Sequence, residues 1–248
     1  MKHVIVKGIT INEAWFKTIR ACLAFGHDYK IDHGEYEGQF RRELDLVTIH
    51  IRQPYVRPLA CSLPSIVPTT DEKIEKYFWS YLMDEDFQNE EERKNNEYKY
   101  ASWVAPSWEE CCVLLSKGGG GCNQATISLG KGAGDYKKFT HPPCLRLIDM
   151  RLHDDELYFI VYFRSWDLIA GLPENLGGIQ LLKETCMDMI STLTGRHIYN
   201  GPIIAISKGL HIYDHFWEIV RKDIGPYEYL RAEDPETLIK ENLDVITF

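Results

Sequence analysis

Two short runs of alternating side chains, joined by a polar turn, place the strongest constraint on how this chain folds. The runs are LRLIDMR at 145–151 and LYFIVYFR at 157–164, with HDDE between them. Successive side chains of a strand point to opposite faces of a sheet. One face of the second run carries Leu157, Phe159, Val161 and Phe163, and the other carries Tyr158, Ile160, Tyr162 and Arg164. This pattern predicts a β-hairpin whose second strand ends at Arg164.

Pairing around that turn brings Arg164 back to the start of the first strand, where Cys144 follows Pro142 and Pro143. Two interpretations of Cys144 stay open. A free cysteine is commonly a small core residue. Alternatively, Cys144 is a nucleophile: a thiol ordinarily titrates near about 8.5, and a nearby arginine lowers that pKa. The second interpretation depends on the register of the hairpin.

The remaining periodic segments predict a mixture of helices and strands. Apolar residues at helical spacing predict helices at 11–25, 71–83, 107–117, 174–193 and 212–222, and β-branched runs predict strands at 44–52 and 202–207. The buried stripe of the longest helix would comprise Leu176, Ile179, Leu182, Cys186, Met189 and Leu193. The polar run 84–99 indicates a surface segment. Because helices and strands do not alternate regularly, we expect an α+β fold, with a mixed sheet and flanking helices in one domain over 1–248.

Composition narrows the classes of partner. The chain has 248 residues and a net charge of −9, so a broad basic surface for nucleic acid is not expected. No signal peptide is recognisable, and no run approaches the roughly 20 apolar residues of a membrane span, so we expect a cytoplasmic protein without a membrane partner. The seven cysteines include no C-x-x-C pair, and no H-E-x-x-H occurs, so no metal site is predicted. The glycine-rich runs at 118–121 and 130–134 do not form a phosphate-binding P-loop.

Four motifs occur in an order and spacing typical of one enzyme family. They are PPC at 142–144, RSWD at 164–167, GLPEN at 171–175 and HIYDH at 211–215. With them the sequence resembles the thymidylate synthase family over residues 98–217, and is most similar to its shorter, archaeal-type members. The resemblance implies a thymidylate synthase-like fold and a homodimer whose sheets pack face to face.

The resemblance also implies a role for each matching residue. Cys144 would attack C6 of a pyrimidine ring, Tyr100 would lie near the proton removed from C5, Arg164 and Ser165 would bind the phosphate, and Asn175 would bind the base edge. His211 and Tyr213 would bind the 3′-hydroxyl of deoxyribose. Asp167, Gly171 and Leu172 would contact folate, and Asp167 would also shape the pocket for the ring.

The expected reaction is C5 methylation of dUMP to dTMP, with 5,10-methylenetetrahydrofolate as co-substrate and without a metal. Addition of a thiolate at C6 makes C5 nucleophilic, and the folate supplies the one-carbon unit and the hydride. An asparagine amide can donate to O4 and accept from N3–H of uracil, whereas cytosine reverses that pattern. Asn175 therefore favours a uracil base.

The sequence departs from the family at positions that matter for binding. Asn123 and Gln124 stand where two arginines ordinarily reach the phosphate of the neighbouring subunit, and Lys131, Arg41 or Arg42 are candidates to compensate.

Leu145 follows the cysteine in place of histidine, Glu174 replaces an apolar residue of the folate wall, and the C-terminal VITF does not match the family tail. Two alternatives therefore stay open: a C5-hydroxymethylase acting on dUMP, dCMP or CMP, and a non-catalytic regulatory protein that binds a nucleotide.

Overall fold

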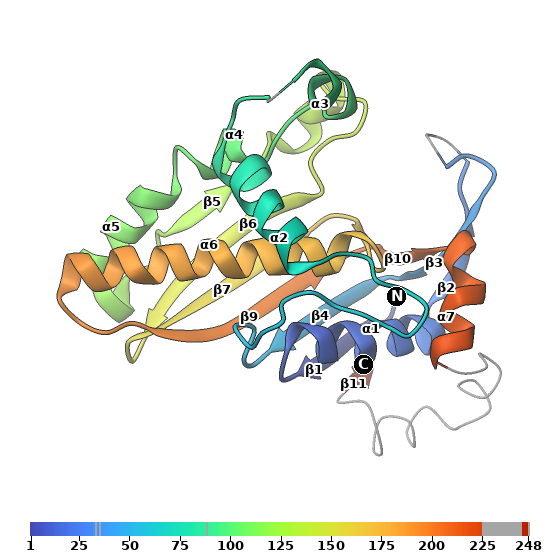
Figure 1. The fold of residues 1–248 in the computed structure, drawn as a ribbon, viewed down its shortest axis with the longest axis horizontal. Coiled ribbons are helices and arrows are strands. Elements are labelled where there is room, and N and C mark those ends of the chain that lie inside the picture. Colours follow the sequence, from blue (N-terminus) through green and yellow to red (C-terminus); the bar gives the residue numbers. More distant parts are fainter. Residues whose placement is uncertain (33, 35, 88, 225–244, 248) are drawn as a thin grey trace.

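A seven-stranded mixed sheet forms the centre of the molecule (Figure 1). The computed structural model describes residues 1–32, 34, 36–87, 89–224 and 245–247. The strands in spatial order are β11 (Val245–Thr247), β1 (His3–Gly8), β4 (Leu46–Ile51), β9 (Tyr199–Ser207), β7 (Glu156–Phe163), β6 (Leu145–His153) and β5 (Thr126–Ser128). The pairs β1–β4 and β7–β9 are parallel, and the other pairs are antiparallel.

A smaller, four-stranded sheet lies beside the first. Its order is β2 (His27–Lys30), β3 (Phe40–Leu44), β10 (Leu210–Tyr213) and β8 (Trp166–Asp167). Strand β10 follows β9 after a short turn, and β8 follows β7 after two residues. The ends of two strands of the large sheet therefore lead directly into the small sheet, and Arg164 and Ser165 lie at one of these junctions.

The helices of the described chain are α1 (Ile11–Phe25), α2 (Asp71–Tyr77), the π-helix η1 (Phe78–Met83), α3 (Glu90–Asn95), α4 (Ala101–Val104), α5 (Trp108–Gly118), α6 (Gly171–Thr194) and α7 (Trp217–Ile224). Of these, α1, α5 and α6 pack against several strands of the large sheet. Short 3₁₀ turns occur at η2 (Gly119–Gly121), η3 (Gly132–Lys137) and η4 (Asp214–Phe216). The long helix α6 crosses the sheet and contacts α1, α2, α5, β7 and β9 (Figure 1).

The two faces of the large sheet differ in burial. On β7, Leu157, Phe159, Val161 and Phe163 have no exposed surface, whereas Tyr158, Ile160 and Tyr162 on the other face are half-buried. This alternation confirms the predicted assignment of side chains to faces. Burial of the first set against α6 contributes hydrophobic free energy of roughly 25 cal/mol per Å² of apolar area removed from water.

Most predicted elements are confirmed, as is the α+β class with a mixed sheet. The helix at 11–25 has the predicted bounds, with Thr10 accepting a hydrogen bond from the backbone N–H of Glu13 at its N-cap. Strand β4, helix α5 and the hairpin β6–β7 lie within one or two residues of their predicted ranges. The polar run 84–99 contains a short helix, α3.

Three local predictions are wrong. The helix at 71–83 changes at Phe78 into a π-helix. In α6 the Leu193 side chain is 49% exposed. Ile190, three residues earlier on the helix, is buried in the core instead. The helix expected at 212–222 begins only at Trp217, because residues 210–213 pair with β3 and β8 as a strand.

Candidate active site

The register of the hairpin places Arg164 directly beside Cys144. Leu145 pairs with Phe163, and the backbone N–H of Arg164 donates to the carbonyl of Cys144 at 2.8 Å. The turn consists of Asp154 and Asp155, both with positive φ, which is the two-residue geometry that matches the twist of paired strands. The predicted juxtaposition of Cys144 and Arg164 is therefore confirmed.

The Arg164 guanidinium is anchored on the segment that carries the cysteine. Its Nε donates to the carbonyl of Pro143 at 3.0 Å, and its Nη2 donates to the carbonyl of Pro142 at 2.6 Å. A guanidinium has five N–H donors, so three remain for a ligand. Within the described part of the chain no carboxylate pairs with Arg164, so its positive charge is balanced only by carbonyl dipoles.

Cys144 is half-buried, and the environment of its thiol differs from the expectation. Burial raises the pKa of Cys144, and the nearby Arg164 and Arg146 offset only part of that rise. The thiol is therefore protonated at neutral pH in the free protein, because desolvation outweighs the two guanidinium groups. The other six cysteines are buried, which leaves Cys144 as the most accessible thiol of the described chain.

Tyrosine side chains enclose the cysteine. The hydroxyl of Tyr100 accepts a hydrogen bond from the backbone N–H of Leu145 at 3.2 Å. The ring of Tyr100 lies 5.2 Å from that of Tyr81 and 5.7 Å from that of Tyr98. Burial raises the pKa of Tyr98, while Arg164 and hydrogen bonds with Tyr100 and the Cys144 backbone oppose that rise. Tyr98 and Tyr81 are thus further members of this site.

Asn175 has a fixed amide orientation in the first turns of α6. The indole N–H of Trp166 donates to its Oδ1 at 2.9 Å, and its Nδ2 donates to the hydroxyl of Tyr77 at 3.0 Å. An indole nitrogen can only donate, so the carbonyl end of the amide must face Trp166. One lone pair on Oδ1 and one N–H on Nδ2 remain for a ligand.

A row of aromatic rings connects Asn175 to the cysteine segment. Tyr77, which accepts from Asn175, stacks on Tyr81 with ring centroids 5.4 Å apart. Tyr81 in turn contacts Tyr100, whose hydroxyl contacts the backbone beside Cys144. The π-helix η1 supplies Tyr81, so the widened helical turn contributes directly to the site.

Asp167 accepts hydrogen bonds from the backbone just before α6 begins. Its Oδ1 accepts hydrogen bonds from the backbone N–H groups of Ile169 and Ala170, at 2.8 and 3.2 Å. Burial raises the pKa of Asp167, and these two bonds counteract the rise in part. Gly171 begins the helix, and a Cβ added to it would make ordinary contacts with Asp167 and Asn175. The Leu172 side chain has no exposed surface and packs in the core.

His211 is a buried histidine with one unused nitrogen. Its Nδ1 hydrogen-bonds the carbonyl of Gly209 at 2.9 Å, and burial lowers the pKa of the imidazole to about 4. His211 is therefore neutral at pH 7, with the proton on Nδ1. Its Nε2 is buried and has no hydrogen-bond partner among the described residues. The ring of Tyr213 lies 4.7 Å from that of His211, and burial raises the pKa of Tyr213 to about 12.

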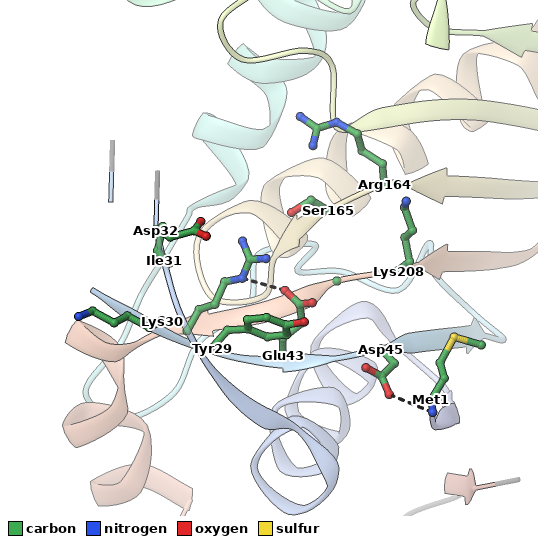
Figure 2. A pocket seen from close by; sticks show the side chains of 12 residues that line it. Met1, Tyr29, Lys30, Ile31, Asp32, Glu43, Asp45, Arg164, Ser165 and Lys208 are labelled. Carbon is green, nitrogen blue, oxygen red and sulfur yellow. Dashed lines mark ion pairs between the residues drawn. The ribbon is translucent and has the colours of Figure 1, made fainter. Parts of the chain in front are cut away.

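A cavity of about 540 Å³ opens between the two sheets next to Arg164 (Figure 2). Its lining includes four cationic side chains (Lys30, Arg41, Arg164 and Lys208) and three carboxylates (Asp32, Glu43 and Asp45), together with Ser165 and Gly209. The excess of cations suits an anionic ligand group. Three cations were candidates to replace the missing phosphate-binding arginines. Arg41 lines the cavity, whereas Arg42 and Lys131 do not.

No grouping of three or more histidine, cysteine or acidic residues suitable for a metal ion occurs among the residues that the structure describes. In the same residues, no helix combines the length and the apolar character that a bilayer span needs.

Comparison with known proteins points to the family that the sequence motifs resemble. A protein of Methanosarcina barkeri named "Putative thymidylate synthase" is 26% identical over 87% of this chain and 92% of its own length. Proteins of the same name from Methanococcoides burtonii and Methanosarcina mazei are 24% and 23% identical over similar shares. The chain resembles the thymidylate synthase family. No family model matches the sequence.

Several members of this candidate site were not predicted from the sequence. Tyr98 precedes Tyr100 by two residues in YKY, and that short repeat was an available signal. No sequence pattern marked Tyr77 or Lys208 as residues of the site. Tyr77 lies 98 positions from its partner Asn175, and such a contact follows only from the packing of α2 on α6.

Proposed function

We propose that this protein catalyses folate-dependent C5 methylation of dUMP to dTMP. The observation that carries the proposal is the position of Arg164, whose backbone bonds Cys144 and whose guanidinium bonds the two preceding prolines. A cysteine, an arginine with three free donors and an adjacent cationic cavity together suit a nucleophile beside a bound phosphate monoester.

Arg164 and Ser165 bind the phosphate of the nucleotide in this proposal. Both residues line the cavity between the sheets. A guanidinium matches two phosphate oxygens at once, and a serine hydroxyl adds a donor.

Asn175 recognises the base. Its amide is held by Trp166 and Tyr77 with one acceptor and one donor unused. The free donor matches O4 of uracil and the free acceptor matches N3–H, while cytosine presents the reverse pattern. The fixed orientation of the amide therefore supports a uracil nucleotide.

His211 and Tyr213 bind the sugar. The buried Nε2 of the neutral His211 is an acceptor without a partner among the described residues, and such an atom is costly to leave unsatisfied. A ribose or deoxyribose hydroxyl would donate to it. The Tyr213 hydroxyl, protonated because its pKa is raised to about 12, adds a second polar contact.

Cys144 gives its thiol proton to water, and Arg164 stabilises the resulting thiolate. The thiolate adds to C6 and opens the C5=C6 double bond to an enolate, and after the one-carbon transfer the loss of the C5 proton expels the thiolate again. Tyr100 bonds the backbone beside Cys144 and Tyr98 lies against Arg164 and Cys144, and these two tyrosines would be the groups that accept the C5 proton, directly or through water. The residues near Asn175 fit a folate: Asp167 offers a carboxylate for N–H groups, and the stacked Tyr77 and Tyr81 offer a flat aromatic wall. When bound there, 5,10-methylenetetrahydrofolate would supply the one-carbon unit and the hydride.

The proposal is tested with dUMP carrying tritium at C5. Incubation with 5,10-methylenetetrahydrofolate is expected to release tritium to water, to produce dihydrofolate and to yield a nucleotide heavier by one methylene group. Release of tritium without dihydrofolate, together with a hydroxymethylated product, would instead identify a C5-hydroxymethylase. Absence of release with dUMP still bound would identify a nucleotide-binding protein without activity.

The hydroxymethylase is the second candidate because of Glu174. Burial raises the pKa of this carboxyl group, and Glu174 lies close enough to Tyr77 to raise the pKa of that tyrosine as well. An acidic group beside the aromatic wall makes the folate pocket more polar. Water would then enter more readily and could capture the one-carbon intermediate in place of hydride.

A further inference from the structure

We infer that Lys208 is the second phosphate-binding cation, supplied by the same chain as Arg164; this inference rests on the proposed function. A phosphate monoester carries close to two negative charges at neutral pH, so a single guanidinium balances only part of it. The two arginines that the family draws from a neighbouring subunit are Asn123 and Gln124 here. The missing charge must come from another residue if the nucleotide binds as proposed.

Lys208 lies near Arg164 and has an amine that is available to a ligand. It lies at the turn between β9 and β10, in the sequence SKG, and lines the same cavity as Arg164 and Ser165. In Figure 2 its side chain extends on the side of the cavity where Arg164 and Ser165 lie. No hydrogen bond or ion pair joins its amine to any other residue that the structure describes, so no carboxylate competes for its charge.

Two of the other cations, Arg41 and Arg42, already have partners. The Nε of Arg41 lies 2.8 Å from a carboxylate oxygen of Glu43. Arg42 is 3% exposed and donates to the carbonyls of Cys22 and Leu23 and to Asp28.

Lys131 lies at the start of η3, outside the cavity, where its backbone N–H donates to Asp135. Lys30 remains at the edge of the cavity, on β2 of the small sheet. Arg164 and Lys208 are thus the two cations that lie at the ends of adjacent strands, β7 and β9, of the large sheet.

Two of the three carboxylates of the cavity have cationic or N–H partners of their own. Asp45 accepts from the backbone N–H of Lys2 at 2.8 Å and lies 4.0 Å from the N-terminal amine of Met1. The Glu43 carboxylate lies beside Gly209, and the Arg41 guanidinium, 2.8 Å away, offsets its charge. We place the phosphate at Arg164, Ser165 and Lys208, where two cations and a hydroxyl group line the cavity together.

Calorimetric titration of the full chain tests the inference with three probes: dUMP, deoxyuridine and inorganic phosphate. Lys208→Gln is expected to weaken dUMP and phosphate binding about tenfold, since bonds to charged groups are the stronger class. Deoxyuridine, which lacks the phosphate, is expected to bind Lys208→Gln and wild type equally. Lys208→Arg is expected to restore dUMP affinity, and Lys117→Gln, on the exposed end of α5, serves as the matched control.

Two results would overturn the inference in distinguishable ways. If Lys208→Gln binds dUMP within twofold of wild type while Arg151→Gln does not, the second charge comes from Arg151, which donates to Asn123 at the edge of the large sheet. The proposed function would then stand without Lys208. If the wild-type chain binds neither dUMP nor phosphate, the proposed function fails together with the inference.

Discussion

At the scale of single residues, Cys144 is governed by two opposing effects. Burial disfavours the thiolate, and the guanidinium groups of Arg164 and Arg146 favour it. We expect the rate of alkylation of Cys144 by iodoacetamide to rise with pH, with a midpoint above that of an exposed cysteine. Replacing Arg164 by Leu removes the larger favourable effect, so the midpoint is expected to move still higher. Peptide mass spectrometry measures the modification, and a midpoint that falls or stays unchanged in Arg164→Leu would contradict the assignment of Arg164.

Cys144→Ser separates binding from chemistry. Serine keeps the shape of the side chain but is a far weaker nucleophile, so we expect turnover to be lost. Affinity for dUMP is expected to stay within about tenfold, because the phosphate and base contacts are untouched and each contributes on the order of 1–3 kcal/mol. Tritium release and calorimetry measure the two quantities. Turnover near the wild-type rate would show that another residue is the nucleophile.

In the proposed function the amide of Asn175 sets base selectivity, and its neighbours fix the orientation of that amide. Trp166→Phe removes the indole donor that fixes the amide, so the orientation that suits uracil is no longer enforced. The ratio of kcat/KM for dUMP to that for dCMP is expected to fall roughly two- to tenfold, the usual range for one neutral hydrogen bond. Asn175→Asp is expected to shift the preference further towards dCMP. Unchanged selectivity in both variants would exclude Asn175 from base recognition.

At the scale of elements, the segment before the cysteine is held by a single carboxylate. Glu97 accepts from the backbone N–H groups of Thr140 and His141, at 3.1 and 2.9 Å, and these bonds lower its pKa. The contribution to stability is therefore present above the ordinary pKa of a glutamate and is lost as the pH falls through the lowered value.

Hydrogen exchange is expected to detect this clamp. The amides of Thr140 and His141 should exchange faster in Glu97→Ala than in wild type at neutral pH, because they lose their acceptor. Glu85→Ala, at another exposed glutamate, is the control and is expected to leave these amides unchanged. Equal exchange in all three proteins would mean that Glu97 does not hold the segment.

Local sequence signals explain why some helices and strands could be predicted. The hairpin carries a strict two-residue alternation over both arms and a polar turn, and its register follows once one face is buried. Helix α1 has its apolar stripe, an N-cap threonine and a following glycine. These signals are local, so the position of Arg164 beside Cys144 could be predicted.

Other elements depend on partners far away in the chain. Residues 210–213 form a strand because β3 and β8 offer hydrogen-bond partners there, which overrides the helical spacing. Strand β8 has only two residues and no pattern of its own. The contact between Tyr77 and Asn175 and the cavity position of Lys208 likewise arise from tertiary packing, so the sequence alone did not reveal them.

At the scale of the whole molecule, one face of the large sheet is only half-buried. Ile160 and Tyr162 on β7 and Ile204 and Ile206 on β9 share that face. We expect a homodimer in which two such faces pack together, as the resemblance to the family implies, because a row of apolar side chains favours burial. Light scattering coupled to gel filtration is expected to give twice the mass of one chain.

Ile204→Glu is expected to shift this equilibrium to the monomer, because a charged group would be buried in the contact. Leu193→Glu, at an exposed position of α6, is the control and is expected to remain dimeric. A wild-type chain that is monomeric at micromolar concentration would show that no such dimer forms. A dimer that Ile204→Glu leaves intact would show that the contact lies on another face.

The anchoring of Arg164 on the two prolines has a consequence for the order of events during a catalytic cycle. Thiolate and bound phosphate are both anions, and the same guanidinium attracts both. Coupling between two equilibria is mutual, so a phosphate that neutralises Arg164 makes Cys144 harder to ionise, and an ionised Cys144 loosens the phosphate to the same degree. If a second cation bound the phosphate, Arg164 could stabilise the thiolate of Cys144 instead. Substrate binding and ionisation of the cysteine would then no longer oppose each other.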